Sequence, residues 1–462
     1  MHLNAKIGLE IHVQLNTKSK LFCTCSTNLA KPNSHVCEVC LGMPGSKPVL
    51  NKKAVDFSVM LALALNCKVP KISRFDRKTY FYPDLPKNYQ ITQYNFPIAQ
   101  KGYLQILNKK IQIRRIQIEE DPGAITYPYH IDVSKYSLID YNRSGFPLCE
   151  VVTEPDFSSS KEVKKFLKMF ISMIKHLGIY SSNNSFRVDT NVSIGRNPRV
   201  EIKNIGSIKD VVSAIEYEIY RQKFVLESGK KITQQTRRFA GSTTEAMREK
   251  ETEEEYGHII DPDLPPIVLT ALHINQIKKK LPELPYQRAK RMFNQYKINK
   301  HQALAIVSEK ELADFYEKVV KHIEPKFAAG WISTQLLKVL NYNNIYFSEI
   351  NLTSQQFISF LKLIQAKEIS DRAADLLLRE LVLKPQNPKK LAEKLNLLNL
   401  TEDELSKLIN IVLKKNKDSV DQYKKGKTKV LAFLIGQVIR ESKGRADAKI
   451  VKELIMKKSF LY

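Results

Sequence analysis

The sequence predicts an α+β fold, in which a mixed α/β domain with an antiparallel-rich sheet is followed by two all-helical domains. The first observation is that strand and helix patterns alternate over about the first 270 residues, whereas only helical periodicity follows Pro285. The second is that the Pro-rich stretches DPDLPPIVL (261–269) and LPELP (281–285) mark the change. A chain of 462 residues is long enough for about three domains. We place them at residues 1–284, 285–345 and 346–462.

Alternation of apolar and polar residues predicts the strands of the first domain. In the first strand, every odd position from Ile7 to Leu15 is apolar. A turn at residues 108–110 predicts a hairpin, and the alternation then slips at Arg114-Arg115, as it does at a β-bulge. A second hairpin is predicted around the turn GRNP at 195–198.

Helical periodicity interrupts these strands. Ser159 begins a capping-box pattern, apolar residues follow at helical spacing, and Gly178 ends the run. Asp210 begins a second long helix that continues to about Glu227. Among the later helices, an Asn-rich stretch at 341–351 predicts the boundary between the two helical domains.

Composition and chain pattern exclude several classes of protein. The longest apolar run, near Val59–Leu65, is far shorter than the roughly 18 residues of a membrane-spanning helix. The N-terminal residues enter a strand pattern at once, without the pattern of a secretory or transit leader. Six cysteines in so long a chain are too few for a disulfide scaffold. We therefore expect a protein of the reducing cytoplasm that has no membrane partner.

The positive charge narrows the choice of partner. The chain has 74 Lys and Arg against 48 Asp and Glu, a net charge of +26, and so basic a protein commonly binds a polyanion. Compositional drift toward Lys, Asn and Ile accounts for the excess equally well. Residues 414–462, however, hold 14 basic and 5 acidic residues, whereas residues 297–413 hold 16 and 14. This tail is either a phosphate-contacting face or a solvated helical surface.

Two pairs of cysteines predict a metal site. Cys23 and Cys25 are separated from Cys37 and Cys40 by eleven residues. A Cys-x-x-Cys pair brings two sulfurs to one metal ion, and a second pair completes a tetrahedral Zn²⁺ site. Four thiolates leave no open coordination position, so the zinc would be structural. The alternative is a set of free buried thiols.

Acidic residues and one histidine form a second constellation. Glu10 and His12 project from the polar face of the first strand. Glu120 continues the apolar face of its strand, and Glu150 stands in the apolar stretch PLCEVV; both carboxylates need a partner there. Three acids and a histidine are better suited to Mg²⁺ than to Zn²⁺. Each residue alone is more often a surface charge.

The segment RKTYFYPDLPKNYQITQY (77–94) combines aromatic, proline and basic residues. Its prolines exclude a regular helix, so it is either a loop that lines a ligand site or an irregular loop packed by its own aromatic residues. The sequence contains no P-loop, dinucleotide-binding or kinase motif. An ATP-dependent activity would therefore use an uncommon site.

Several stretches together resemble one family, the GatB/GatE family of the glutamyl/aspartyl-tRNA amidotransferases, in its bacterial GatB form. The resemblance covers nearly the whole chain in order. It is carried by IGLEIHVQL (7–15), CEVCLGMPGSKPVLN (37–51), the segment 77–94, IEEDPGA (118–124), DYNRSGFPLCEVVTEPD (140–156), VEIKNIGSI (200–208), TRRF (236–239), MREKE (247–251), DPDLPPIVL (261–269), PELPYQRAKRM (282–292), KFAAGWI (326–332) and GKTKVLAFLIGQVIRESKGRAD (426–447).

This resemblance implies a cradle-like catalytic domain, a helical linker domain and a helical tail that binds tRNA. It implies ATP-dependent amidation of glutamate or aspartate misacylated onto tRNA(Gln) or tRNA(Asn). An amidase partner would supply ammonia from glutamine, and a small clamp protein would hold the two larger chains together. A non-catalytic, zinc-containing tRNA-binding or assembly protein is the alternative. The length leaves no room for the large extra domain of the archaeal GatE relatives.

The resemblance also assigns residues. It implies that Glu10, His12, Glu120 and Glu150 form a catalytic Mg²⁺ site, with Glu119 as a substitute for Glu120 or a residue behind it. Lys78 and Lys87 would neutralise the phosphates of ATP, and the four cysteines match a zinc knuckle that some members carry. The implied tRNA-binding residues are Lys424, Lys425, Lys427, Lys429, Arg440, Lys443 and Arg445. Many members have Ala-Gly-Lys where this chain has Pro122-Gly123-Ala124, so a lysine near the site is missing.

Overall fold

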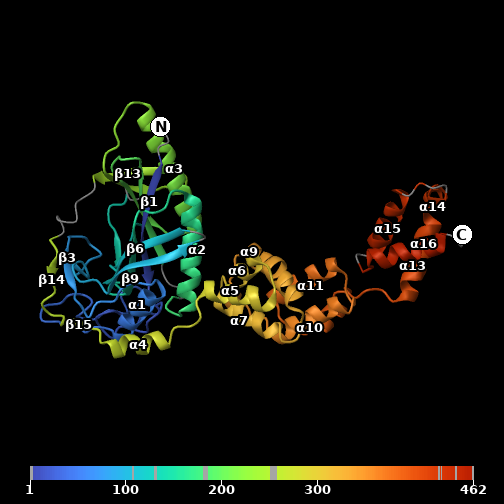
Figure 1. Cartoon of the computed structure of the whole chain (residues 1–462), viewed down its shortest axis with the longest axis horizontal. Coiled ribbons are helices and arrows are strands. Elements are labelled where there is room, and N and C mark those ends of the chain that lie inside the picture. Colours follow the sequence, from blue (N-terminus) through green and yellow to red (C-terminus); the bar gives the residue numbers. More distant parts are fainter. Residues whose placement is uncertain are drawn as a thin grey trace. The chain divides into compact units, whose positions relative to one another are not determined.

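The computed structural model of the chain describes residues 4–106, 109–129, 133–180, 186–249, 257–424, 427, 429–442 and 445–459. The chain divides into two compact units, Met1–Pro285 and Tyr286–Tyr462. The first contains strands and helices and the second contains helices, as Figure 1 shows. The predicted α+β class is confirmed.

A large, mostly antiparallel sheet organises the first unit. Its strand order is β13-β12-β11-β10-β1-β9-β6-β5, and among the described pairs only β11 and β12 run parallel. The predicted hairpins are present as β5–β6 and β10–β11, and the register of β6 shifts between Ile113 and Arg115, where the bulge was expected. The bounds are β1 Ala5–Gln14, β5 Ala99–Ile106, β6 Lys109–Glu120, β9 Pro147–Thr153, β10 Phe186–Ile194, β11 Val200–Ile205, β12 Gln235–Phe239 and β13 Thr244–Glu249.

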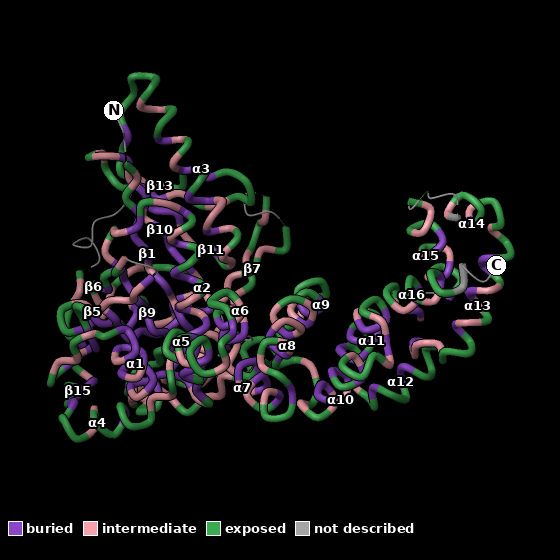
Figure 2. Tube along the Cα trace, turned by 45° about the vertical axis from the view of Figure 1, so that its right-hand side comes forward, coloured by how far each residue is buried: buried purple, intermediate pink, exposed green. Residues whose placement is uncertain are grey.

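Helices cover the apolar face of this sheet. The odd positions of β1 belong to one buried cluster with α1 (Lys52–Ala64), α2 (Ser160–His176) and α3 (Ile208–Glu227), and Figure 2 shows buried residues along the central strands. Ser159 caps α2 as predicted. Helix α3 begins two residues before Asp210, because the side chain of Ser207 accepts a hydrogen bond from the Asp210 amide at 3.1 Å.

Smaller elements lie at the edges of the first unit. Strand β4 (Tyr89–Thr92) pairs with β3 (Asp76–Thr79) and contacts β6 of the large sheet. The remaining elements are β2 Ile72–Ser73, β7 Ala124–Thr126, β8 Leu138–Asp140, β14 Ile259–Ile260, β15 Ile267–Val268 and α4 Ala271–Lys279. Within the described residues, no helix is both long and apolar enough to cross a membrane.

The second unit contains two hydrophobic cores. One includes buried residues from Ala289 to Leu397, and the other those from Leu405 to Ile455. The first core is continuous across the predicted boundary at residue 345, because the rings of Phe347 and Phe357 lie 4.8 and 5.3 Å from that of Phe315.

The helices of the second unit follow one another in sequence order. The first core is formed within α5 Pro285–Tyr296, α6 Lys300–Ile306, α7 Lys310–Val319, α8 Pro325–Gly330, a π-helix Trp331–Leu336, α9 Leu337–Asn343, a 3-10 helix Phe347–Glu349, α10 Ser354–Gln365, α11 Asp371–Leu383 and α12 Pro388–Lys394. The second is formed within α13 Glu402–Lys415, α14 Lys417–Lys424, α15 Lys429–Glu441 and α16 Ala448–Ser459.

Candidate functional site

The register of the central strands gathers polar side chains on one face of the large sheet. Residue His12 of β1 is paired with Glu150 of β9, and Glu10 is paired with Asp189 of β10. Directly opposed residues in antiparallel strands project to the same face. The structure therefore brings together three of the four predicted site residues, Glu10, His12 and Glu150.

The fourth predicted residue, Glu120, lies elsewhere, and Glu119 takes its place. The Oε1 atom of Glu119 lies 3.3 Å from His12 Nδ1, and Thr92 Oγ1 donates a hydrogen bond to Glu119 Oε2 at 3.1 Å. Glu120 projects to the opposite face, where Lys87 Nζ binds its two oxygens at 2.5 and 2.6 Å. Because successive residues of a strand face opposite ways, only one of the two acids can join the cluster.

Burial and charge together set the protonation of this group. Burial disfavours the charged form of His12, but the hydrogen bond to Glu119 and the nearby charges of Glu150 and Asp189 raise its pKa to about 10. Burial also opposes the ionisation of Glu119, yet the bond from His12 holds the Glu119 pKa below its usual value. Burial and the charge of Glu119 raise the pKa of Glu150 to about 7. A positive charge, supplied either by a proton or by a metal ion, therefore stabilises this group of carboxylates.

A second set of acids lies beside the first. Carboxylate oxygens of Glu10, Asp189 and Glu201 lie within 4.8 Å of one another. Asn191 Nδ2 donates to Glu10 Oε1 at 3.0 Å, and Thr236 Oγ1 donates to Glu201 Oε2 at 3.0 Å. Asn191 Oδ1 is buried without a hydrogen-bond partner, so it is a further oxygen available to a ligand. Three carboxylates and an amide oxygen fit a hard divalent cation such as Mg²⁺.

Sequence reasoning did not identify Asp189 or Glu201. Both occupy polar positions in alternating strands, β10 and β11, and such positions are usually solvated. Their only distinguishing signal is the cross-strand register, which the chain's alternation does not specify. Once β10 is paired with β1, Asp189 lies opposite Glu10.

The four predicted cysteines come together. The sulfur atoms of Cys23, Cys25, Cys37 and Cys40 lie within 4.8 Å of one another. The amide of Cys37 lies 3.1 Å from Cys40 Sγ, and Nζ of the buried Lys20 donates to the same sulfur at 3.4 Å. Hydrogen bonding from Cys23 and the charge of Lys20 lower the pKa of Cys40 to about 4, against the effect of burial. This arrangement of donors fits a tetrahedral thiolate site.

The two lysines of the loop segment have different surroundings. Lys78 lies close enough to Glu119 for its charge to help lower the pKa of that carboxyl. Lys87 is bound to Glu120, and 8% of its side chain is exposed. Its side chain also packs on the cysteine turn, because a Cβ on Gly42 would lie 2.3 Å from Lys87 Cγ. Lys78 is therefore better placed than Lys87 to meet a phosphate.

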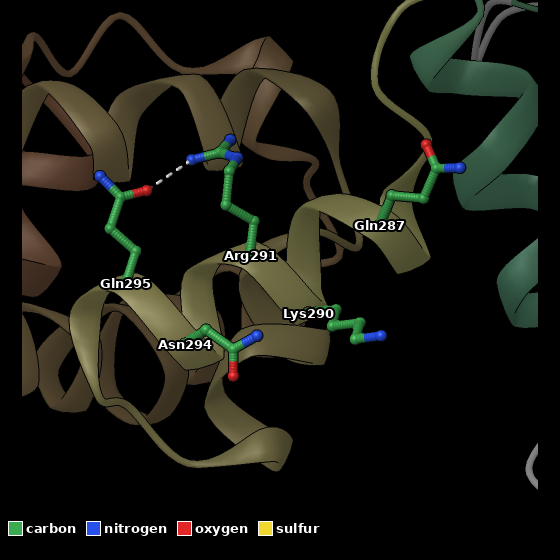
Figure 3. Close-up of a pocket in the computed structure, with 5 residues that line it drawn as sticks. All are labelled: Gln287, Lys290, Arg291, Asn294 and Gln295. Atoms are coloured by element: carbon green, nitrogen blue, oxygen red, sulfur yellow. Dashed lines mark hydrogen bonds between the residues drawn. The ribbon is translucent and has the colours of Figure 1, made fainter.

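A shallow hollow on α5 has a different chemistry. Figure 3 shows it lined by Gln287, Lys290, Arg291, Asn294 and Gln295. Arg291 is engaged within the unit, since its Nη1 lies 3.1 Å from the Gln295 side-chain oxygen and 2.7 Å from a carboxylate oxygen of Glu317. The lining contains amides and cations without a carboxylate, so it does not offer ligands to a metal ion.

The structure places part of the predicted basic surface of the tail. Lys427, Lys429 and Arg440 are exposed, and Arg445 is half-buried. Lys424 is the last residue of α14. Lys425 and Lys443 lie outside the described residues.

Comparison with known proteins gives consistent matches along the chain. The family model described as "GatB/GatE catalytic domain" matches residues 5–275, and the one described as "GatB domain" matches residues 314–458. The chain is 41% identical to the GatB chain of the aspartyl/glutamyl-tRNA(Asn/Gln) amidotransferase of Thermotoga petrophila, over 99% of each chain. It is also 41% identical to that of Carboxydothermus hydrogenoformans, over 98% of each, and 40% identical to that of Thermodesulfovibrio yellowstonii, over 99% of each.

Substitution of Gly42 tests the contact between the cysteine turn and Lys87. Gly42 has φ +66°, and an added Cβ would meet Lys87 at 2.3 Å. We expect Gly42→Ala to displace Lys87 from Glu120 and to lower the free energy of unfolding by about 2–4 kcal/mol, as backbone strain and overpacking add. Chemical denaturation of the full chain measures the change.

Gly45→Ala is the matched control, because Gly45 has φ +83° with nothing within 4 Å of its Cβ position. The Gly45→Ala substitution should lower the free energy of unfolding by only about 1 kcal/mol, which is the cost of backbone strain. Equal losses for the two variants would contradict a supporting role of the turn.

Proposed function

Because the chain belongs to the GatB family of the aspartyl/glutamyl-tRNA(Asn/Gln) amidotransferases, we propose how its acidic site takes part in tRNA-dependent transamidation. The chain is a component of a glutamine-hydrolysing ligase. Its substrates are Glu-tRNA(Gln) or Asp-tRNA(Asn), and the products are Gln-tRNA(Gln) or Asn-tRNA(Asn). The observation that carries the proposal is the group of carboxylates gathered on one face of the sheet.

The chemistry requires an activated carboxyl group. Ammonia does not displace oxide from the side-chain carboxylate of the aminoacyl group, because oxide is a poor leaving group. Transfer of the γ-phosphoryl group of ATP to one carboxylate oxygen gives an acyl phosphate and ADP. Ammonia then forms the new C–N bond, the C–O bond to phosphate breaks, and the nitrogen releases a proton. Such phosphoryl transfer depends on positioning and charge neutralisation.

Glu10, Asp189 and Glu201 are the proposed ligands of Mg²⁺, together with the free amide oxygen of Asn191. When bound, the ion supplies positive charge for the phosphates of ATP. Lys78, which acts on Glu119 electrostatically, adds a second cation at this face of the sheet. These cations offset the repulsion between anionic ATP and the acidic side chains.

His12, Glu119 and Glu150 form the neighbouring set, in which Glu119 replaces the predicted Glu120. His12 Nδ1 and Glu119 Oε1 lie 3.3 Å apart, and this pairing holds both side chains at the same face of the sheet. Glu150 is the neighbouring carboxylate proposed to accept the proton that the incoming nitrogen releases. Gln117 Nε2 orients this carboxylate through a hydrogen bond of 2.8 Å.

The proposed assembly is a heterotrimer. An amidase partner hydrolyses glutamine and passes ammonia to this chain, and a small clamp protein holds the two larger chains together. The basic tail binds the body of the tRNA through its phosphates. The four cysteines hold a structural Zn²⁺, which stabilises the turn that packs against Lys87.

Separate substitution of the two neighbouring acids, Glu119 and Glu120, tests the assignment of Glu119. In the assembled complex with Glu-tRNA(Gln), ATP and glutamine, Glu119→Gln should lower the amidation rate about 100-fold, because it removes the carboxylate that pairs with His12 and orients it beside the proposed metal ligands. Glutamine hydrolysis should persist. Glu120→Gln should act mainly on stability, since it leaves Lys87 buried and unpaired. An unchanged amidation rate in the Glu119→Gln variant would contradict the assignment of Glu119 to the site.

Metal analysis tests the zinc site. Protein purified without chelators or added thiols should carry about one equivalent of zinc per chain, and Cys40→Ser should carry less than about half of that, because a tetrahedral site loses one ligand. Cys149→Ser, which changes a buried cysteine outside the cluster, is the control and should keep its zinc. A parent chain with less than about half an equivalent would contradict the assignment.

Charge removal tests the tail. The combined variant Lys427→Gln, Lys429→Gln and Arg440→Gln should weaken tRNA binding and reduce its salt dependence by roughly one unit of slope per lost phosphate contact. Glutamine hydrolysis should not change. The control removes three exposed charges from α2, with Lys161→Gln, Lys164→Gln and Lys165→Gln. Similar losses from both variants would point to the general charge of the protein instead.

A further inference from the structure

Two aromatic side chains are exposed near the start of the loop between β3 and β4. The exposed fractions of Phe81 and Tyr82 are 79% and 54%. A single exposed apolar residue is ordinary on a protein surface. Two adjacent rings that are left uncovered on one short loop, beside a polar site, point instead to a ligand that supplies the missing contact.

The loop that carries these rings is held in place. Tyr141 Oη donates a hydrogen bond to Pro83 O at 2.8 Å, and the Gly123 amide donates one to Asp84 O at 2.8 Å. The rings of Pro83 and Pro86 also fix their own φ angles. A ligand that binds here meets a prearranged surface, and little free energy is lost in ordering the loop.

The same loop is tied to the acidic site. Tyr80, the residue before Phe81, is partly buried. Strand β3 ends at Thr79, two residues before Phe81, and it pairs with β4, from which Thr92 Oγ1 donates a hydrogen bond to Glu119 Oε2 at 3.1 Å. The exposed rings are therefore carried on the segment that borders the acidic cluster.

The chemistry of the substrate selects one occupant. An aminoacyl group reaches the acidic cluster while still esterified to the terminal ribose of its tRNA, and the last nucleotides of that tRNA are unpaired. Unpaired bases stack on aromatic side chains whatever their sequence. Acidic residues repel phosphates, whereas stacking uses the uncharged face of the base.

We propose that Phe81 and Tyr82 form a stacking platform for the unpaired 3′-terminal nucleotides of the aminoacylated tRNA. The platform holds the end of the tRNA so that the aminoacyl group reaches the acidic cluster. This inference rests on the proposed function and deepens it, because it names residues that bind the substrate of the same site. The adenine of ATP is the competing occupant, and the experiment separates the two.

The test is a cycle that combines a protein change with an RNA change. The affinity of the assembled complex, which contains the full chain, is measured for intact tRNA and for tRNA that lacks its three 3′-terminal nucleotides. Stacking of one base is worth roughly a 5- to 150-fold change in affinity, and the parent should lose at least this much on RNA truncation. The variant Phe81→Leu, Tyr82→Leu should bind intact tRNA weakly and lose little more on truncation. Tyr220→Leu, Phe224→Leu changes two equally exposed aromatic residues of α3 and is the control.

A second readout does not depend on the double variant. A tRNA with 2-aminopurine in place of its terminal adenine should lose fluorescence on binding to the parent complex, because stacking quenches this base. The conservative variant Phe81→Tyr, Tyr82→Phe keeps both rings and should quench it as well. An unquenched probe on the parent complex would overturn the proposal even where the leucine variant fails to fold.

The remaining outcomes are equally decisive. Independent, additive effects of the protein and RNA changes would refute contact between them. A raised KM for ATP with unchanged tRNA affinity would assign the rings to the adenine of ATP and overturn the proposal. A parent complex without ATP-dependent amidation would contradict the proposed function itself, whereas an active parent with an additive cycle would contradict the platform alone.

Discussion

The antiparallel pairing of β1 with β9 and β10 is the constraint on which the acidic site depends. Its register places His12 opposite Glu150 and Glu10 opposite Asp189. Gathering like charges costs free energy, which burial of the odd-numbered side chains of β1 on the other face helps to offset. A slip of one residue would exchange the two faces and bring isoleucines into the site. The apolar pattern therefore protects the position of the carboxylates as well as the core.

The two glutamates at the end of β6 have opposite surroundings for the same reason. Glu119 faces the cluster, and Glu120 is directed to the other side, where Lys87 neutralises it. A buried ion pair recovers little more than its own desolvation cost, so its contribution is mainly positional. The pair fixes the end of β6, and with it Glu119. Because Gly42 of the cysteine turn packs on Lys87, the thiol cluster supports the carboxylate site through this one side chain.

The sequence is most informative where a feature depends on neighbouring residues. Alternation predicts β1 and the bulge in β6, capping predicts the start of α2, and spacing predicts the cysteine cluster. It is weaker where the feature depends on pairing between distant strands. The family resemblance assigns Glu120 to the site, and that assignment stays a prediction, whereas the structure pairs Glu119 with His12 and directs Glu120 to Lys87. Asp189 and Glu201 become visible only through the register with β1. Likewise, an Asn-rich stretch near residue 345 resembles a linker, although Phe347 packs into the preceding core.

Charge is distributed in a way that constrains how an anionic substrate can be held. The chain carries +26 overall, yet the residues proposed to act on the substrate are mainly carboxylates. Attraction between phosphates and the basic tail is long-ranged and weakens with salt, so it can recruit tRNA without positioning its reactive end. Near the carboxylates, the same phosphates would be repelled unless cations intervene. Binding at this end must therefore rely on short-range interactions that do not depend on net charge: metal coordination for ATP, and contacts with the faces of the bases for the end of the RNA.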